Sequence, residues 1–103
     1  MKNTKPTAPL AMKTGIELIA AERARQVSQE EWTELHDGAH TEGELAEAAC
    51  CYANPKHSPG FLARWWPWDR EFWKPTPDNR VRELVKAGAL IAAEIDRLNR
   101  ATK

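Results

Sequence analysis

An aromatic and charged segment at residues 64–75 (RWWPWDREFWKP) carries the side chains best suited to chemistry in this sequence. Four of the five tryptophans of the chain lie in it, interleaved with arginine, lysine and acidic residues. Indole faces beside fixed positive charges can stack on bases and pair with phosphates, at about 1–3 kcal/mol per stacked base. Because Pro67 and Pro75 each lack an N–H, we expect an ordered loop rather than a helix here. Alternatively, the indoles fill the core or an interface.

This composition predicts a site for a nucleotide-like ligand. The tryptophans would stack on the base, the cations would bind the phosphate, and a polar stretch around Trp32 would support both. The expected ligand-binding residues are Trp32, His36, Asp37, His40, Arg64, Trp66, Trp68, Arg70, Trp73 and Lys74. The two histidines have the spacing of zinc ligands on a helix, but Gly38 lies between them, so we expect no structural zinc.

Acidic side chains offer an alternative chemistry. Glu44 and Glu47 lie one turn apart on an expected helix, where together with Glu94 they would hold Mg²⁺ through oxygen ligands. Glutamates at this spacing are also ordinary residues of solvated helix faces. The sequence has no G-x-S-x-G nucleophile motif and no glycine-rich phosphate loop. We therefore expect ligand binding without a cofactor, and keep a Mg²⁺-dependent reaction as the alternative.

Length and charge narrow the possible functions. The 103 residues make one small domain. Fifteen basic and fifteen acidic residues give zero formal charge. A net positive electrostatic field that would attract long nucleic acid or an anionic membrane is therefore not expected. No apolar run reaches the length of a membrane span or resembles a signal peptide, so we expect a cytosolic protein without a membrane partner. The adjacent Cys50 and Cys51 cannot bridge without strain, and we expect them to be reduced and buried.

Helical signals place these residues in an all-α domain of residues 14–103, after a flexible lead-in at residues 1–13. Three helices are expected, with a long Trp-rich loop between the second and the third and no strand. They run from Gly15 to about Glu31, from Glu42 to Ala53, and from Asn79 to Arg100. Capping boxes at Thr14 with Glu17 and at Thr41 with Glu44 begin the first two, and Asp78 caps the third.

Apolar periodicity assigns a packing face to each helix. In the first helix the inward stripe is Ile16, Ile19, Ala20, Arg23 and Val27, and the outward residues are Glu17, Glu22, Arg25 and Gln29. The second helix turns Leu45, Ala48, Ala49 and Tyr52 inward. In the third, Leu84, Gly88, Ile91, Ile95 and Leu98 form an a/d seam. Because this helix also has a surface of small residues, it suits a close partner helix from the same chain or a second copy, and we expect a homo-oligomer.

Several motifs, in their order along the chain, resemble a family of small phage and prophage proteins. They are Glu22-Arg23-x-Arg25-Gln26, Trp32-Thr33-x-x-His36-Asp37-x-x-His40, Gly43-Glu44-Leu45-Ala46-x-Ala48-Ala49-x-x-Tyr52-Ala53, Trp66-Pro67-Trp68, Trp73-Lys74-Pro75 and the run from Leu84 to Leu98. The resemblance covers about residues 15–100, with Glu31 where the family has a glycine. It implies a phage-encoded accessory protein of the host cytosol and no particular reaction.

Two looser resemblances bear on mechanism. Glu44-x-x-Glu47 is similar to half of the Mg²⁺ site of MazG-like nucleotide pyrophosphohydrolases, whose second half, E-x-x-D, is not matched at Glu94-Ile95-Asp96. The run from Arg23 to Asp37 resembles ryanodine-receptor repeat domains, which are proposed nucleotide sensors. Phage proteins of this size include sponges that sequester cyclic nucleotide signals, which implies counter-defence by binding. The alternatives are a pyrophosphohydrolase and a protein inhibitor of a host defence complex.

Overall fold

The computed structural model describes residues 13–29, 40–54 and 59–102, and the part of the chain so described is helical without any strand. Its elements are α1 (Gly15–Gln29), α3 (Glu44–Ala53), α4 (Pro59–Trp65), the short 3₁₀ helix η2 (Arg70–Phe72) and α5 (Arg80–Ala101). This confirms the all-α class. Of the lead-in expected at residues 1–13, residues 1–12 lie outside the described residues. None of the described helices is long and apolar enough to cross a membrane.

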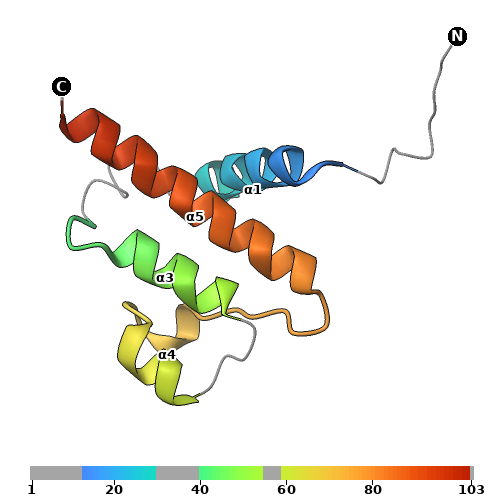
Figure 1. The fold of residues 1–103 in the computed structure, drawn as a ribbon, viewed down its shortest axis with the longest axis vertical. Coiled ribbons are helices and arrows are strands. Elements are labelled where there is room, and N and C mark those ends of the chain that lie inside the picture. Colours follow the sequence, from blue (N-terminus) through green and yellow to red (C-terminus); the bar gives the residue numbers. More distant parts are fainter. Residues whose placement is uncertain (1–12, 30–39, 55–58, 103) are drawn as a thin grey trace, which may run out of the picture.

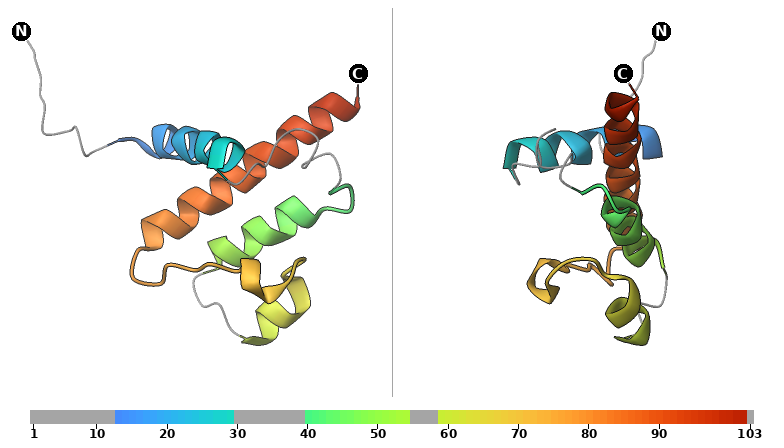
Figure 2. Two further views of the ribbon diagram at one scale, coloured as in Figure 1. Left: turned by 180° about the vertical axis from the view of Figure 1, so that it is seen from behind. Right: turned by 90° about the vertical axis from the view of Figure 1, so that its left-hand side faces the viewer.

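The long helix α5 is the element against which the others are arranged (Figure 1). α3 runs beside it in the opposite direction, and α1 crosses another side of it, as the view from behind shows (Figure 2). α4 packs against α3. The core residues are Leu45, Ala48, Ala49, Cys51, Tyr52, Leu62, Trp66, Ala87, Leu90 and Ala93. The four residues expected to face inward from α3 are thus buried.

Of the three N-terminal caps predicted from the sequence, the structure contains one. Thr14 and Glu17 form the expected capping box, with the Thr14 N–H donating to Glu17 Oε1 at 2.8 Å and the Glu17 N–H to Thr14 Oγ1 at 3.2 Å. The expected Thr41 cap is wrong, because Gly43 takes a left-handed conformation (φ 86°) and α3 starts only after it. The expected Asp78 cap is also wrong, since Asn79 accepts from the Arg82 N–H at 3.1 Å.

Residues 59–79, between α3 and α5, contain helical structure that was expected to be a loop. Residues 59–65 form α4, which begins at Pro59, because proline needs no N–H partner in the first turn of a helix. α4 ends at Trp65, shortly before Pro67. η2 follows within the stretch expected to be irregular. The three-helix prediction therefore missed α4 and η2.

Arg80, at the start of α5, links α5 to the C-terminal end of α3 through side-chain hydrogen bonds. Its guanidinium donates to the backbone oxygens of Tyr52 (2.9 Å), Asn54 (3.5 Å) and Ala53, which are carbonyls at the C-terminal end of α3. The same guanidinium pairs with the buried Glu83 carboxylate at 3.2 Å. Glu83 also accepts from the Thr76 N–H at 3.0 Å. One arginine therefore caps α3 and neutralises a buried charge.

The packing face predicted for α1 is wrong at Ile16, Ala20, Val27 and Glu22, whereas Ile19 and Arg23 of the predicted stripe are half-buried. Ile16 is 82% exposed, whereas Glu22, expected to face outward, is only 3% exposed. Because Glu22 meets arginines from its own helix and from α5, burial of its charge is compensated. Close contact between α1 and α5 also depends on Gly88, where an added Cβ would lie 2.4 Å from Ile19 Cδ1.

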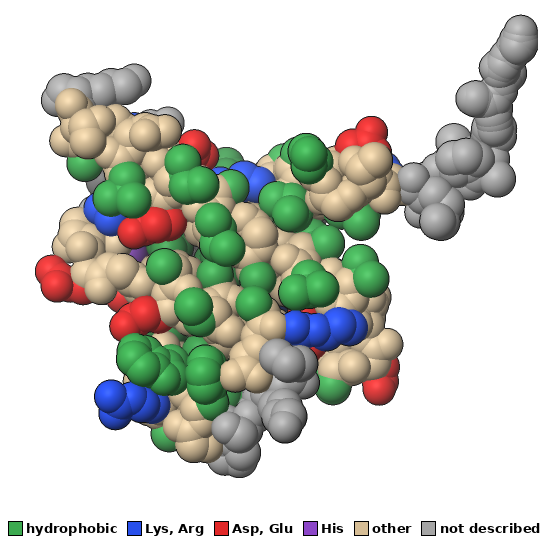
Figure 3. All heavy atoms as spheres, viewed as in Figure 1, with side chains coloured by type: hydrophobic (Ala, Val, Ile, Leu, Met, Phe, Trp, Pro, Cys, Tyr) green, Lys and Arg blue, Asp and Glu red, His purple; other side chains and the backbone are tan. Residues whose placement is uncertain are grey.

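The predicted seam on α5 is largely uncovered in the single chain. Four of its members, Leu84, Ile91, Ile95 and Leu98, are 47–52% exposed. The buried residues of α5 lie on other faces of the helix: Glu83, Val85, Ala87, Ala89, Leu90 and Ala93. Small residues thus form much of the intramolecular contact, as the slim surface suggested. The aliphatic side chains of the seam remain on the surface, where hydrophobic side chains are visible along this face of the molecule (Figure 3).

Candidate functional site

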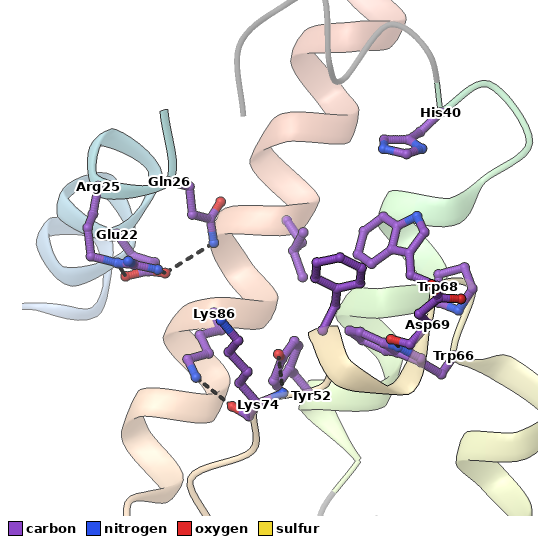
Figure 4. Close-up of a pocket in the computed structure, with 13 residues that line it drawn as sticks. Glu22, Arg25, Gln26, His40, Tyr52, Trp66, Trp68, Asp69, Lys74 and Lys86 are labelled. Carbon is purple, nitrogen blue, oxygen red and sulfur yellow. Dashed lines mark hydrogen bonds and ion pairs between the residues drawn. The ribbon is translucent and has the colours of Figure 1, made fainter. Parts of the chain in front are cut away.

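A pocket of about 570 Å³ lies between α1, α5 and the segment that follows α4. α1 supplies Glu22, Arg25 and Gln26, and α5 supplies Lys86 and Leu90 (Figure 4). The aromatic wall, defined here as Tyr52, Trp66, Trp68 and Phe72, forms another side. His40, Pro67, Asp69 and Lys74 complete the lining. The pocket therefore joins a charged side to an aromatic side.

Ring contacts hold the aromatic wall together. The ring of Trp66 meets those of Trp68 and Tyr52 edge to face, at centroid distances of 5.4 Å and 5.7 Å. Trp73 packs against Tyr52 at 4.6 Å and against Trp66 at 5.1 Å. These separations and tilts fall in the favourable range for aromatic pairs. Trp66 is buried in this cluster, while Phe72 remains exposed.

Hydrogen bonds fix the backbone around the aromatic wall. The Trp66 Nε1–H donates to the Asp69 carbonyl oxygen at 3.0 Å. The Lys74 N–H donates to the Tyr52 hydroxyl at 3.2 Å, and the ammonium of Lys86 donates to the Lys74 carbonyl oxygen at 2.7 Å. Lys86 Nζ also lies 5.3 Å from the Tyr52 ring centroid. Lys86 is half-buried, and this burial, followed by the charge of the nearby Arg82, lowers the pKa of its ammonium group.

Glu22 organises the charged side of the pocket. Its two carboxylate oxygens accept from Arg25 Nε and Nη2, both at 2.9 Å. Arg82 Nη1, from α5, donates to Glu22 Oε1 at 2.6 Å. The Gln26 amide nitrogen donates to Oε2 at 3.1 Å. Four charge-assisted hydrogen bonds thus use the acceptor capacity of this carboxylate, and one of them links α1 to α5.

The protonation of Glu22 reflects this network. Burial alone would raise its pKa, but hydrogen bonds and charges from Arg25 and Arg82 outweigh burial and lower the pKa from 4.5 to about 2. Glu22 is therefore an anion at any physiological pH.

This shift predicts acid sensitivity. Because the folded-state pKa of Glu22 is lowered, its stabilisation is fully present above pH 4.5 and is lost as the pH falls towards 2. Between pH 5 and pH 3 we expect about 1–2 kcal/mol of unfolding free energy to be lost through this residue. NMR titration of the side-chain carboxyl carbon, with urea unfolding at both pH values, tests this. A midpoint near 4.5 would contradict the buried ion pair.

Gln26 carries a buried polar atom at the pocket that has no hydrogen-bond partner among the described residues. The residue is 2% exposed, and its amide nitrogen is directed to Glu22. Among the described residues, no hydrogen-bond partner meets its buried amide oxygen. Figure 4 places the Gln26 amide on the side of α1 that faces the pocket. Buried polar oxygens are normally paired, so this one calls for a physical explanation.

The structure brings together only part of the site expected from the sequence. His40, Trp66, Trp68 and Lys74 line the pocket, and the His40 ring lies 5.2 Å from that of Trp68. Trp73 supports the aromatic wall without lining the pocket. The expected residues Trp32, His36 and Asp37 lie outside the described residues.

Two of the cations expected to bind phosphate are not at the pocket. Arg64 is exposed and lies over the Trp65 ring, 5.0 Å from its centroid. Arg70 is exposed on η2. The cations that do line the pocket are Arg25, Lys74 and Lys86.

The carboxylates of the alternative metal site do not assemble into one. Within residues 13–29, 40–54 and 59–102, no three His, Cys, Asp or Glu side chains come together as a metal site. Glu94 instead pairs with Arg97 through two hydrogen bonds of 2.8 Å and 3.0 Å. The hydrogen bond to Glu94, and then the charges of Glu94 and Glu44, raise the pKa of Arg97, so Glu94 is already paired with a cation of the protein.

Cys51 is not an activated nucleophile. Cys51 is buried as expected, and burial raises the pKa of its thiol to about 11, which keeps it protonated. Cys50 is exposed, contrary to the expectation that both would be buried.

The sequence argument missed Glu22, Arg25, Gln26 and Lys86 as pocket residues. Their signal was the polar spacing of three and four along α1, which places Glu22, Arg25 and Gln26 on one face. Apolar periodicity assigned Glu22 and Arg25 to solvent and did not place Gln26, because periodicity does not reveal a buried charge that is paired with a residue of another helix.

Comparison of the chain with protein-family models, curated protein sequences and solved structures gives no match. The case for a function therefore depends on the geometry and chemistry of the pocket.

Proposed function

We propose that this protein binds a small, planar, anionic ligand of the nucleotide class in the pocket between α1 and the aromatic wall. One observation carries the proposal: a single pocket joins the aromatic wall to the cations of α1 and α5. Its volume of about 570 Å³ lies within the range of known small-molecule sites, roughly 300–1,000 Å³. Such a pocket accommodates one nucleotide unit rather than a long polymer.

Aromatic stacking supports this ligand class. Trp68 is partly exposed at the pocket, while the rings of Trp66 and Tyr52 hold its neighbourhood rigid. A base stacked on an indole gains about 1–3 kcal/mol, and a rigid wall avoids the entropy cost of ordering it.

The charge balance supports an anionic ligand. Glu22 is neutralised by Arg25 and Arg82, and the remaining acidic and basic residues of the lining are Lys74, Lys86 and Asp69, two cations and one anion. Lys86 is anchored by the Lys74 carbonyl oxygen and is partly desolvated, so an anion beside it interacts more strongly than in water. We place the phosphate of the ligand near Lys86 and its base at Trp68.

We propose retention of the ligand rather than its conversion. The described residues group no metal-binding trio, and the Cys51 thiol is protonated. Retention also agrees with the resemblance to phage proteins, for which we propose a counter-defence role as a nucleotide sponge.

Substitutions at the pocket test this proposal. Trp68→Ala and Lys86→Met should each weaken binding of adenosine monophosphate, measured by isothermal titration calorimetry, by about 10-fold or more, because each removes a contact worth about 1.4 kcal/mol. Arg64→Ala is the matched control, since Arg64 lies outside the pocket, and should leave affinity unchanged. Equal loss in all three variants, or none in the pocket variants, would contradict the assignment.

A second proposal concerns the partner of α5. Leu84, Ile91, Ile95 and Leu98 follow one another at intervals of seven, four and three residues, which places them on one face of α5, with small Ala87 and Ala92 at their flanks. Such a surface is complementary to a second copy of itself, and no charged side chain within the repeat opposes close approach. We propose that two copies pair through α5.

Pairing through α5 makes a separate prediction. Ile95→Lys should shift the protein from dimer to monomer in sedimentation velocity, because it places a charge in the seam. Asp96→Lys changes charge at a neighbouring exposed position and should leave the dimer intact. A wild-type protein that is monomeric at high micromolar concentration would rule out this contact.

A further inference from the structure

The orientation of the Gln26 amide is fixed by chemistry. Its nitrogen lies 3.1 Å from Glu22 Oε2, and a carboxylate with a pKa near 2 can only accept hydrogen bonds. The amide must therefore turn its N–H₂ group to Glu22 and its oxygen away. Arg25 and Arg82 hold Glu22 itself in place, so the direction of the Gln26 oxygen is set by residues on both α1 and α5.

The Gln26 amide oxygen is a hydrogen-bond acceptor to which no described residue donates. It is buried, and Gln26 lines the pocket. A buried hydrogen-bond acceptor without a donor costs free energy. A ligand that donates an N–H to this oxygen restores the hydrogen bond. Sites built around such a group reject ligands that lack the matching donor. Gln26 thus has the properties of a specificity-determining residue.

We infer that the pocket selects nucleotides whose base carries an amino group, which donates an N–H to the Gln26 oxygen. The inference depends on the proposed function, because it names the part of a nucleotide read at α1. The aromatic wall stacks any base, and Lys86 attracts any phosphate, so neither discriminates among bases. Gln26 supplies the discrimination, and Glu22 is a positioning residue that holds the amide nitrogen and so keeps the oxygen turned away from its own carboxylate.

The test uses pairs of ligands that differ by one amino group. Adenosine monophosphate is compared with purine riboside monophosphate, and cytidine monophosphate with pyrimidinone riboside monophosphate, by isothermal titration calorimetry with the full chain. At least one pair should show about tenfold tighter binding of the amino compound, the effect of one hydrogen bond to a buried acceptor. Binding of both members of each pair within twofold would overturn the inference and leave the proposed function standing. Failure of all four to bind would overturn the proposed function itself.

Two variants assign the preference to Gln26. Gln26→Leu removes the acceptor and should reduce the amino preference to less than about twofold. Glu22→Gln frees the Gln26 amide to rotate, because the amide that replaces the carboxylate can donate as well as accept, and should relax the same preference. Arg64→Ala should retain it. Should Gln26→Leu fail to fold, the wild-type ligand pairs and Glu22→Gln still decide. A preference that persists in both folded variants would assign selectivity to another residue and contradict the inference.

Discussion

Replacing Glu22 with alanine is expected to lower the free energy of unfolding by about 3 kcal/mol. Breaking a buried ion pair costs about 3–5 kcal/mol when the remaining charges stay buried. Arg25 and Arg82 are about a third exposed, so water relieves part of this cost and the low end applies. The substitution also removes the carboxylate that joins α1 to α5. The expected fall in Tm is about 12 °C or more.

Urea unfolding of Glu22→Ala and of Glu42→Gln measures this effect. Glu42 is exposed, so its substitution should change the unfolding free energy by no more than about 0.5 kcal/mol. The double variant Glu22→Ala, Arg82→Ala should be less destabilised than the sum of the single variants, because both partners of one interaction are lost together. A loss below about 0.5 kcal/mol in Glu22→Ala would mean that α1 is not held by this contact.

Replacing Arg80 with alanine is the second large effect, and we again expect a loss of about 3 kcal/mol. The change leaves the buried Glu83 without its cationic partner and the last carbonyls of α3 without their donor. Arg80→Lys should recover only part of the loss, because an ammonium restores the charge but cannot span several carbonyl oxygens at once.

Thermal unfolding followed by circular dichroism provides the comparison. Arg70→Ala is the matched control, since Arg70 is an exposed arginine at a helix start, and its Tm should stay within about 3 °C of the wild type. A similarly small change of Tm in Arg80→Ala would contradict the conclusion that Arg80 stabilises the contact between α3 and α5.

Local signals explain which parts of the fold were predictable. The Thr14 and Glu17 capping box acts within one turn, and the apolar repeat of α3 faces the core that it implies. The start of α3 was less predictable, because the conformation of Gly43 overrides the Thr41 signal. α4 was missed because Pro59 marks a turn and a first helical turn equally well.

In the candidate site, the aromatic side was more predictable from the sequence than the charged side. Its aromatic half was predictable, because Trp66 and Trp68 lie two residues apart and their composition alone indicates a clustered wall. Its charged half depends on Arg82 reaching Glu22 across 60 positions of the chain. No periodicity records such a pairing, so Glu22 was assigned to solvent although it is 3% exposed.

NMR of the indole N–H groups during titration with adenosine monophosphate is the most direct test of the central claim that the pocket binds a nucleotide. Each indole gives one signal, which a Trp→Phe variant assigns. We predict saturable shifts at Trp66 and Trp68, which line the pocket, and an unmoved signal at Trp65, which lies outside it. Shifts confined to Trp65, or no shift at millimolar nucleotide, would contradict the account.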